Sequence, residues 1–382
     1  MSSWQASTSG ATPANDMKPT TRVYTEFRAD QVAETKYETI KVALDVHADW
    51  IVVVRILDHG APQPAQRFRE PELLKWLESQ QAKATMVHTC YEAGPFGYGL
   101  HRRLTALGIE NLVVQPVNLD ERRTRVNNDQ TDARELVLRL DRYVSGNPKA
   151  LAKVRVPTPE EEQRRIESRQ REQLQRETKR VTAQGHALLL TQGYREKGEW
   201  WRGKRWEVLG ARLPEWLVRR LEVFRRILVV LTEELQRASQ ELAGAAPAKR
   251  PKGLGGLTCE VIEREVQDWH RFNNRREVGS YTGLCGGISA SGSTVRLLSI
   301  TKHGNVRLRT ALVELAWRMT LWQPQCPLLR KWRPVLTNPK ARAAARKKAI
   351  VAVARQLAVD LWRWRTGRTT PEQLGWVMGA AG

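Results

Sequence analysis

Short apolar runs separated by turn-forming residues dominate the first third of the chain after a polar start. These runs predict five strands, at 40–47, 51–57, 65–69, 84–91 and 112–115. Helical periodicity predicts three helices, at 71–81, 98–107 and 131–143. A strand hairpin followed by alternating strands and helices indicates an α/β domain with a mixed sheet.

The middle of the chain has a different pattern, which is typical of a coiled coil. Residues 160–180 are almost wholly polar or charged, which predicts a solvated helix or the polar side of a coiled coil. After an interruption at 193–203, apolar residues recur in alternating steps of four and three, at Leu217, Leu221, Phe224, Leu228, Leu231, Leu235, Ala238 and Leu242. This heptad pattern predicts a coiled-coil hairpin or a dimer contact, with a simple amphipathic core helix as the alternative.

The last third is expected to be mostly helical, with long helices at 306–322 and 341–364 and a Gly/Ser-rich loop at 283–293. Residues 1–38 are polar and predict a mobile tail. We therefore expect a tail (1–38), an α/β domain (39–150), a coiled-coil or helical segment (151–245) and a mostly helical domain (246–382).

The net charge of the chain indicates the kind of partner that it binds. The 382 residues carry a net charge of +22, with a sequence pI of about 10.3. Such an excess favours a polyanionic partner, and its spread over the whole chain favours nucleic acid over a ribosome- or membrane-surface role. No apolar run suits a transmembrane helix or a signal peptide, so a cytoplasmic, nucleoid-associated protein is expected. The four cysteines show no metal-ligand spacing and are expected to be free thiols.

Four acidic residues suit a site for divalent metal. Asp45 and Glu92 lie at the ends of predicted strands, and Asp129 and Asp132 lie three apart where a helix begins. Carboxylates are preferred ligands of Mg²⁺, with Mn²⁺ as a possible substitute, and such ions assist phosphodiester transfer. Each acid alone has a structural alternative, as a turn residue or a helix N-terminal acid. Two acids after apolar strands favour the metal site, in the layout of ribonuclease-H-like folds.

Three segments around these acids resemble, in order and spacing, the DEDD transposases of the insertion-sequence-110 family, including its 1111 subgroup. They are Val42-Ala-Leu-Asp-Val-His, Tyr91-Glu-Ala-Gly-Pro-Phe-Gly-Tyr-Gly-Leu and Asn128-Asp-Gln-Thr-Asp-Ala-Arg. The resemblance continues through 272–283, Ser289-Ala-Ser-Gly-Ser-Thr-Val-Arg and Ile300-Thr-Lys-His-Gly-Asn-Val-Arg-Leu-Arg. It covers residues 40 to 365.

The resemblance implies a RuvC-like N-terminal domain, a coiled-coil insertion and a C-terminal transposase domain with a nucleophilic serine. By motif position the four acids are Asp45, Glu92, Asp129 and Asp132, and the serine is Ser291. Members of the family excise and insert their element, and a structured non-coding bridge RNA pairs with target and donor DNA. The implied partners are double-stranded DNA, a guide RNA and further copies of the chain in a homodimer or homotetramer. Metal held by the acids would orient Ser291 across a domain interface to form a DNA–phosphoserine bond.

The chain departs from the family pattern in two places. The usual Pro-Gly-Ile-Gly turn reads Lys252-Gly-Leu-Gly-Gly-Leu, with the proline displaced to Pro251. The segment Cys285-Gly-Gly-Ile-Ser-Ala lacks the usual proline, which leaves Ser289 and Ser293 as alternative nucleophiles. On the residues alone Ser291 is an ordinary turn serine. The other readings of the chain are a metal-dependent junction nuclease that uses water and a non-catalytic nucleic-acid scaffold.

Basic residues around these motifs are candidate phosphate contacts. They are Arg122, Arg123, Arg125, Arg296, Lys302 and Arg307. A tryptophan cluster at 200–206, with Trp201 beside Arg202, Lys204 and Arg205, is a candidate for stacking on unpaired bases. Packing of these rings against the base of the coiled coil is the alternative.

Overall fold

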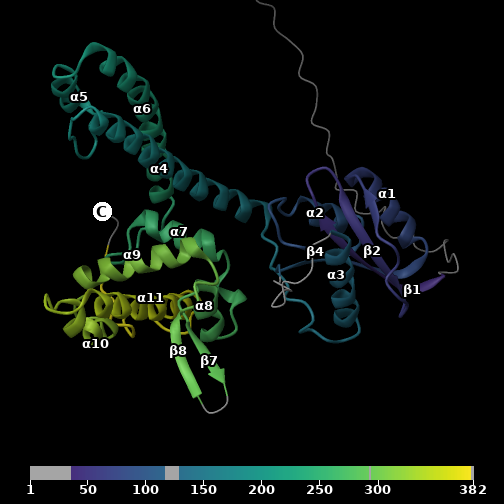
Figure 1. The fold of residues 1–382 in the computed structure, drawn as a ribbon. Helices are drawn as coiled ribbons and strands as arrows, with labels where there is room; N and C mark the ends of the chain where they lie inside the picture. Colours follow the sequence, from purple (N-terminus) through teal and green to yellow (C-terminus); the bar gives the residue numbers. More distant parts are fainter. Residues whose placement is uncertain (1–35, 117–128, 292–293, 380–382) are drawn as a thin grey trace, which may run out of the picture. The chain divides into compact units, whose positions relative to one another are not determined.

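The computed structural model describes residues 36–116, 129–291 and 294–379, so most of the predicted tail lies outside the described residues (Figure 1). The chain divides into two compact units, Met1–Val156 and Pro157–Gly382, and each is considered by itself. Within the described ranges, no helix combines the length and the apolar character that crossing a membrane requires. All four cysteines carry free thiols, as predicted.

The first unit is a mixed α/β domain built on five strands. They are β1 (Tyr37–Val46), β2 (Ile51–Leu57), β3 (Gln66–Phe68), β4 (Ala84–Glu92) and β5 (Glu110–Val114). The sheet order is β3-β2-β1-β4-β5, with antiparallel pairs up to β1 and parallel pairs from β1 to β5. The five predicted strands are confirmed to within three residues, because each short apolar run is long enough to be buried but too short for a helix.

Helices cover both faces of this sheet. They are α1 (Glu70–Gln81), α2 (Gly99–Ala106) and α3 (Asp129–Val144). Alternate residues of β1 point to opposite faces. Val42 and Leu44 therefore share one core with the leucines of α1 and α2, whereas Ala43 shares the other core with Val137 and Leu140 of α3.

The second unit begins with a helical hairpin, which we call the arm. It consists of α4 (Pro159–Thr191), α5 (Gly203–Gly210) and α6 (Glu215–Gly244), and α4 and α6 lie side by side (Figure 1). The heptad leucines Leu217, Leu221 and Leu228 are fully buried in a core with Val181 and Leu189 of α4. These three seam positions are therefore covered from within the chain, whereas a coiled coil along the whole seam and a contact with a second copy stay predictions.

The rest of the second unit, which we call the C-terminal body, is mostly helical. Its helices are α7 (Gly256–Val266), α8 (Arg275–Thr282), α9 (Val306–Trp322), α10 (Pro327–Leu336) and α11 (Ala343–Arg365), with a 3₁₀ turn at Trp269–Arg271. They bury one shared apolar core, to which α11 contributes Ile350, Val353, Leu357 and Leu361. Short strands β6 (Arg250–Pro251) and β9 (Met378–Gly379) pair at its edge.

The Gly/Ser-rich stretch, predicted as a loop, instead forms a β-hairpin that projects from the C-terminal body (Figure 1). Its strands are β7 (Gly286–Ser291) and β8 (Thr294–Ile300), paired antiparallel with an irregularity between Gly286 and Ile288. A Cβ on Gly287 would lie 3.2 Å from Cβ of Leu298, so the glycine allows a close approach of the two strands. The prediction was wrong because glycine content marks such a bulge as readily as a loop.

Candidate catalytic carboxylates and the serine hairpin

The sheet register brings Asp45 and Glu92 to the same edge of the first unit. In the parallel ladder of β1 and β4, Leu44 pairs with Tyr91, so the next residue of each strand is the predicted acid. Paired strands lie about 4.8 Å apart. Residues two positions earlier, Ala43 and Cys90, belong to the core under α3, so both carboxylates lie on that face.

The start of α3 lies at this same edge. The buried Lys41 Nζ forms an ion pair with the partly exposed Asp141 Oδ1 at 2.8 Å, which places the C-terminal half of α3 beside Lys41 of β1. The core residues of α3 pack on the part of the sheet between Lys41 and Asp45. Because Asp141, near the end of the helix, contacts Lys41, the helix runs antiparallel to β1. Asp45 is about 13 Å beyond Lys41, and Asp132 is about 13 Å before Asp141 along the helix axis. Asp132 is exposed, and its approach to Asp45 stays a prediction.

Asp45 has a partner that the sequence did not single out as functional. Its Oδ2 lies 3.0 Å from Nε2 of His47, two residues further along the chain, and both side chains are about one third exposed. Beyond the turn, the Arg67 guanidinium lies 4.5 Å from the centre of the Trp50 ring. The contact between Asp45 and His47 could have been predicted from the sequence, since residues i and i+2 of a strand lie on the same face of the sheet.

The carboxylate oxygens at this edge fit a hard divalent ion such as Mg²⁺ or Mn²⁺ in their chemistry. Among the side chains that the structure describes, no three His, Cys, Asp or Glu residues form a metal-binding group. Asp129 opens α3, but its side chain lies outside the described set. The structure therefore aligns Asp45 with Glu92 beside the start of α3, and convergence of all four acids stays a prediction.

Ser291 is the last residue of β7, where the backbone pairs with Thr294 of β8. It thus stands at the end of the β7–β8 ladder, although its side chain lies outside the described set. Ser289 lies two residues earlier, exposed, and opposite Arg296. Ser293 lies outside the described residues.

The tryptophan cluster of the arm is packed, in agreement with the alternative of the two readings. Trp201 is 3% exposed and Trp200 is fully buried, and the Trp200 indole donates to the carbonyl of Thr182 at 3.2 Å. The prediction that Trp201 stacks on bases is therefore corrected, because its ring lies in the core of the arm. Around it, Arg202 pairs with Glu199 and Arg205 with Glu196, and Lys204 is exposed.

The other predicted phosphate contacts differ in their surroundings. Arg296 and Lys302 are exposed, and Lys302 has a positive φ of 59°. Arg307 instead forms an ion pair with Glu172 of α4, which assigns it a structural contact between the C-terminal body and the arm. Arg122, Arg123 and Arg125 lie outside the described residues.

Similarity to known proteins covers both units. A family model described as the transposase IS116/IS110/IS902 family matches residues 246–329. The protein y4rJ of Sinorhizobium fredii, named as a candidate transposase, is 34% identical over 302 residues, which cover 72% of this chain and 75% of that protein. The transposase for insertion sequence element IS1111A of Coxiella burnetii is 29% identical over 140 residues, or 36% and 37% of the two chains. Because the similarity to y4rJ extends over most of both proteins, this chain belongs to the IS116/IS110/IS902 family of transposases.

Proposed function

We propose that this transposase excises and inserts a mobile element as a metal-dependent DNA recombinase with a serine nucleophile. The observation that supports it most is the register of β1 and β4, which sets Asp45 beside Glu92 at the edge where α3 begins. A strand end of this kind places acids from distant parts of the sequence within reach of one substrate. The net charge of +22 supports a nucleic-acid substrate.

The sheet supports a ribonuclease-H-like, RuvC-like assignment for the first unit. The order β3-β2-β1-β4-β5 has an antiparallel hairpin on one side of β1 and parallel strands on the other. A helix antiparallel to β1 covers the face that carries the acids. This arrangement is the one expected where two strand-end carboxylates act together with acids at a helix start.

Asp45, Glu92, Asp129 and Asp132 would hold the divalent ion. When bound, Mg²⁺ supplies positive charge that stabilises the oxygens of a phosphodiester during its cleavage. The protein's own contribution is to orient the acids on a rigid sheet. Asp45 is oriented further by His47, whose ring nitrogen lies 3.0 Å from the carboxylate.

Ser291 is the proposed nucleophile. Its hydroxyl oxygen attacks the phosphorus of a DNA phosphodiester, a new serine O–P bond forms and the bond from phosphorus to the leaving deoxyribose oxygen breaks. The hydroxyl proton leaves to a base, and the leaving oxygen takes up a proton. Attack of a DNA hydroxyl on the phosphoserine reverses these bonds, so the strand is rejoined without ATP.

A structured guide RNA and an oligomer complete the proposal. The family resemblance supports a bridge RNA that selects donor and target DNA, and excess positive charge suits a second polyanion. Joining four DNA ends favours a homodimer or homotetramer. Digestion of copurified RNA should abolish target choice, and retained target choice would rule out the guide.

The chemistry is tested on junction DNA of the element with Mg²⁺ in a denaturing gel. Wild type should give a covalent DNA–protein band, which should disappear in Ser291→Ala, in Asp45→Asn and with a chelator. Ser289→Ala is the matched control and should keep the band. An adduct that survives Ser291→Ala would refute the assigned nucleophile.

The same gel distinguishes the proposed recombinase from the alternative function, a RuvC-like junction nuclease. The carboxylate edge of the first unit could direct water at the phosphodiester without any serine. The nuclease would cut DNA in an Asp45-dependent way without ever giving a protein-linked band.

A further inference from the structure

A cationic groove lies in the C-terminal body, beside the hairpin that carries Ser291. It has a volume of about 1070 Å³ and is lined by α8, α10, α11 and the base of β7 and β8. Its cations are Arg275, Arg276, Lys302, Lys331, Lys347, Lys348 and Arg355. All of them are exposed, and within the described part of the chain no Asp or Glu lines the groove.

These cations have no acidic partner among the residues that the structure describes. Within the described residues, none of the seven forms an ion pair with an acidic side chain. Between residues 246 and 382 the sequence has 24 Lys and Arg but only eight Asp and Glu. Mutual repulsion of seven like charges around one cavity is offset when an anion binds there.

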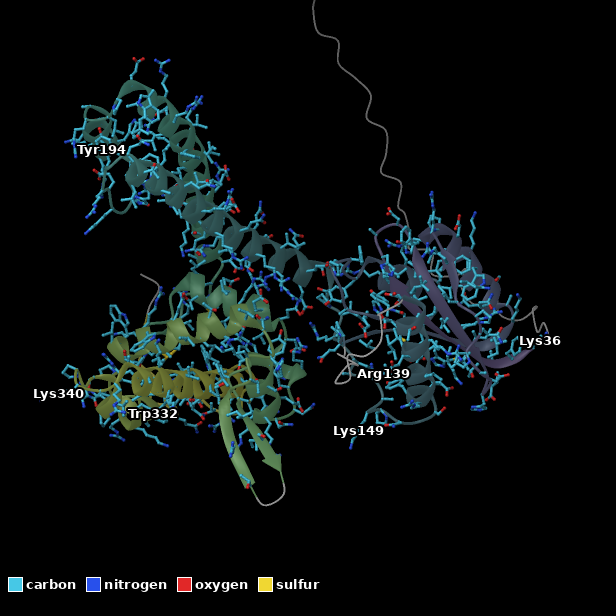
Figure 2. The ribbon with its side chains drawn as sticks, viewed as in Figure 1. Lys36, Arg139, Lys149, Tyr194, Trp332 and Lys340 are labelled. Atoms are coloured by element: carbon cyan, nitrogen blue, oxygen red, sulfur yellow. The ribbon has the colours of Figure 1, made fainter. Side chains whose placement is uncertain are left out.

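The floor of the groove is apolar, unlike its rim. The apolar lining residues that form this floor include Leu284, which is buried, and Ile300 and Val351, which are half-buried. Trp332 of α10, labelled in Figure 2, also lines the groove, with Lys331 Nζ 5.7 Å from its ring centre. A ligand that fits this surface must offer phosphates to the rim and flat apolar faces to the floor.

We propose that this groove holds an unpaired strand of DNA. In a duplex the base faces are stacked inside, so only sugars, phosphates and base edges would reach the floor. A single strand exposes its base faces to aromatic and apolar side chains while cations follow its phosphates. The volume matches a large small-molecule pocket, roughly 300–1,000 Å³, which suits a few nucleotides and not a duplex.

The position of the groove favours DNA as the strand. Gly286 lines the groove and opens β7, and Ser291 closes the same strand five residues later, about 17 Å away. Ser299 and Gln356 are the uncharged polar side chains among the described residues of the lining, so few acceptors are available there for a ribose hydroxyl. This inference rests on the proposed function in one respect: because Ser291 is proposed to attack DNA, DNA is the polymer expected beside the hairpin.

Binding is measured with the nuclease-treated full chain carrying Ser291→Ala, in a chelator, so that no cleavage occurs. The probe is a fluorescein-labelled oligothymidylate of about 12 nucleotides, a length within the site size of known single-strand binders. Fluorescence anisotropy over a series of salt concentrations gives the affinity and its salt slope. The groove variant is Lys347→Ala/Lys348→Ala, and the matched control is Arg220→Ala/Arg226→Ala on the arm, also an exposed pair of cations.

The groove variant should bind about tenfold more weakly, with a salt slope shallower by about 1.4, since each lost phosphate contact on a single strand removes about 0.7. The control should stay within about twofold of the parent. Equal losses in both pairs, or no loss in the groove variant, would overturn the inference. So would tighter binding of a duplex or of the matching RNA strand than of the DNA strand.

A photochemical experiment locates the strand without relying on affinity. Oligodeoxynucleotide containing 5-iodouracil is irradiated on the protein, and the crosslinked peptide is identified by mass spectrometry. A crosslink to the peptide that contains Trp332 supports the groove, whereas crosslinks confined to the arm exclude it. A covalent adduct at Ser291 with no loss of binding in the groove variant would leave the proposed function standing and remove this inference alone.

Discussion

The arm and the groove of the C-terminal body are both rich in basic residues, but they use them differently. On the arm, Arg219 pairs with Glu215 at 2.8 Å and Arg237 pairs with Glu234 at 3.1 Å, each within one helical turn. Around the groove, the cations come from three helices and the loop after β8, and the described residues that line it include no acid. Net charge alone therefore does not locate a nucleic-acid site, because paired arginines stabilise helices and unpaired ones remain available for phosphate.

Where the arm meets the C-terminal body, basic residues take a third role. Arg264 of α7 is 7% exposed, and it donates to Glu260 at 3.0 Å and to Glu167 of α4 at 2.6 Å. The neighbouring Glu265 is fully buried and accepts from Arg169 of α4 and from Asn305. We call this cluster the joint, because it connects α4 to α7 through ion pairs between partly exposed charges of α4 and buried charges of α7.

The largest effect is expected at the joint. Arg264→Met should destabilise the packing of α7 against α4 by about 3 kcal/mol, because it removes the buried cation of Glu260 and leaves it only the half-exposed Arg164, at 3.3 Å. Hydrogen exchange of peptides from α7, followed by mass spectrometry, measures the loss of protection. Met preserves most of the apolar stem, so the lost charge dominates. Unchanged protection in α7 would show that the ion pair contributes as little as the surface pairs of the arm.

The sequence predicted the joint poorly, although it predicted its helices well. Glu167 and Arg264 are almost 100 residues apart, and no periodicity signals that they meet. The groove could not be predicted either, because the approach of Lys347 on α11 to Arg275 and Lys331 depends on the packing of separate helices. By contrast, the position of Asp45 beside Glu92 could be predicted, because each ends a short apolar run and neighbouring parallel strands end at the same edge of a sheet.

The joint should also respond to acid. Burial alone would raise the pKa of Glu265, but hydrogen bonds from Arg169 and Asn305 outweigh it and lower the pKa below the ordinary 4.5. Because the folded pKa is lowered, its stabilisation is present above pH 4.5 and is lost as pH falls through the folded pKa. Glu265→Gln should cost roughly 1.5–3 kcal/mol at neutral pH.

The difference between wild type and Glu265→Gln should shrink in acid, since both side chains are then neutral. Thermal unfolding of the two proteins, compared at neutral pH and at successive pH values below 4.5, measures this convergence. A difference in thermal stability between the two proteins that stays constant over this pH range would show that Glu265 is not the titrating group.

The tip of the arm depends on apolar packing and not on charge. A Cβ on Gly185 of α4 would overlap the buried ring of Trp200, so Gly185→Ala should destabilise the arm by about 1–3 kcal/mol. Gly210→Ala is the matched control, because its Cβ would meet open space. Loss of helical circular dichroism on heating should shift down only for Gly185→Ala. Equal shifts would mean that the tryptophan core is looser than this structure indicates.

The smallest effect is expected from the surface pairs of the arm. Arg237→Ala removes a pair with Glu234 in which the side chains are 65% and 44% exposed. Solvent and salt screen such a pair, so the loss should not exceed about 0.5 kcal/mol and should vanish in high salt. Hydrogen exchange in α6 at low and high salt measures it. A loss comparable with that of Arg264→Met would mean that the arm's charges act as a network, and the contrast between paired surface arginines and buried ones would no longer hold.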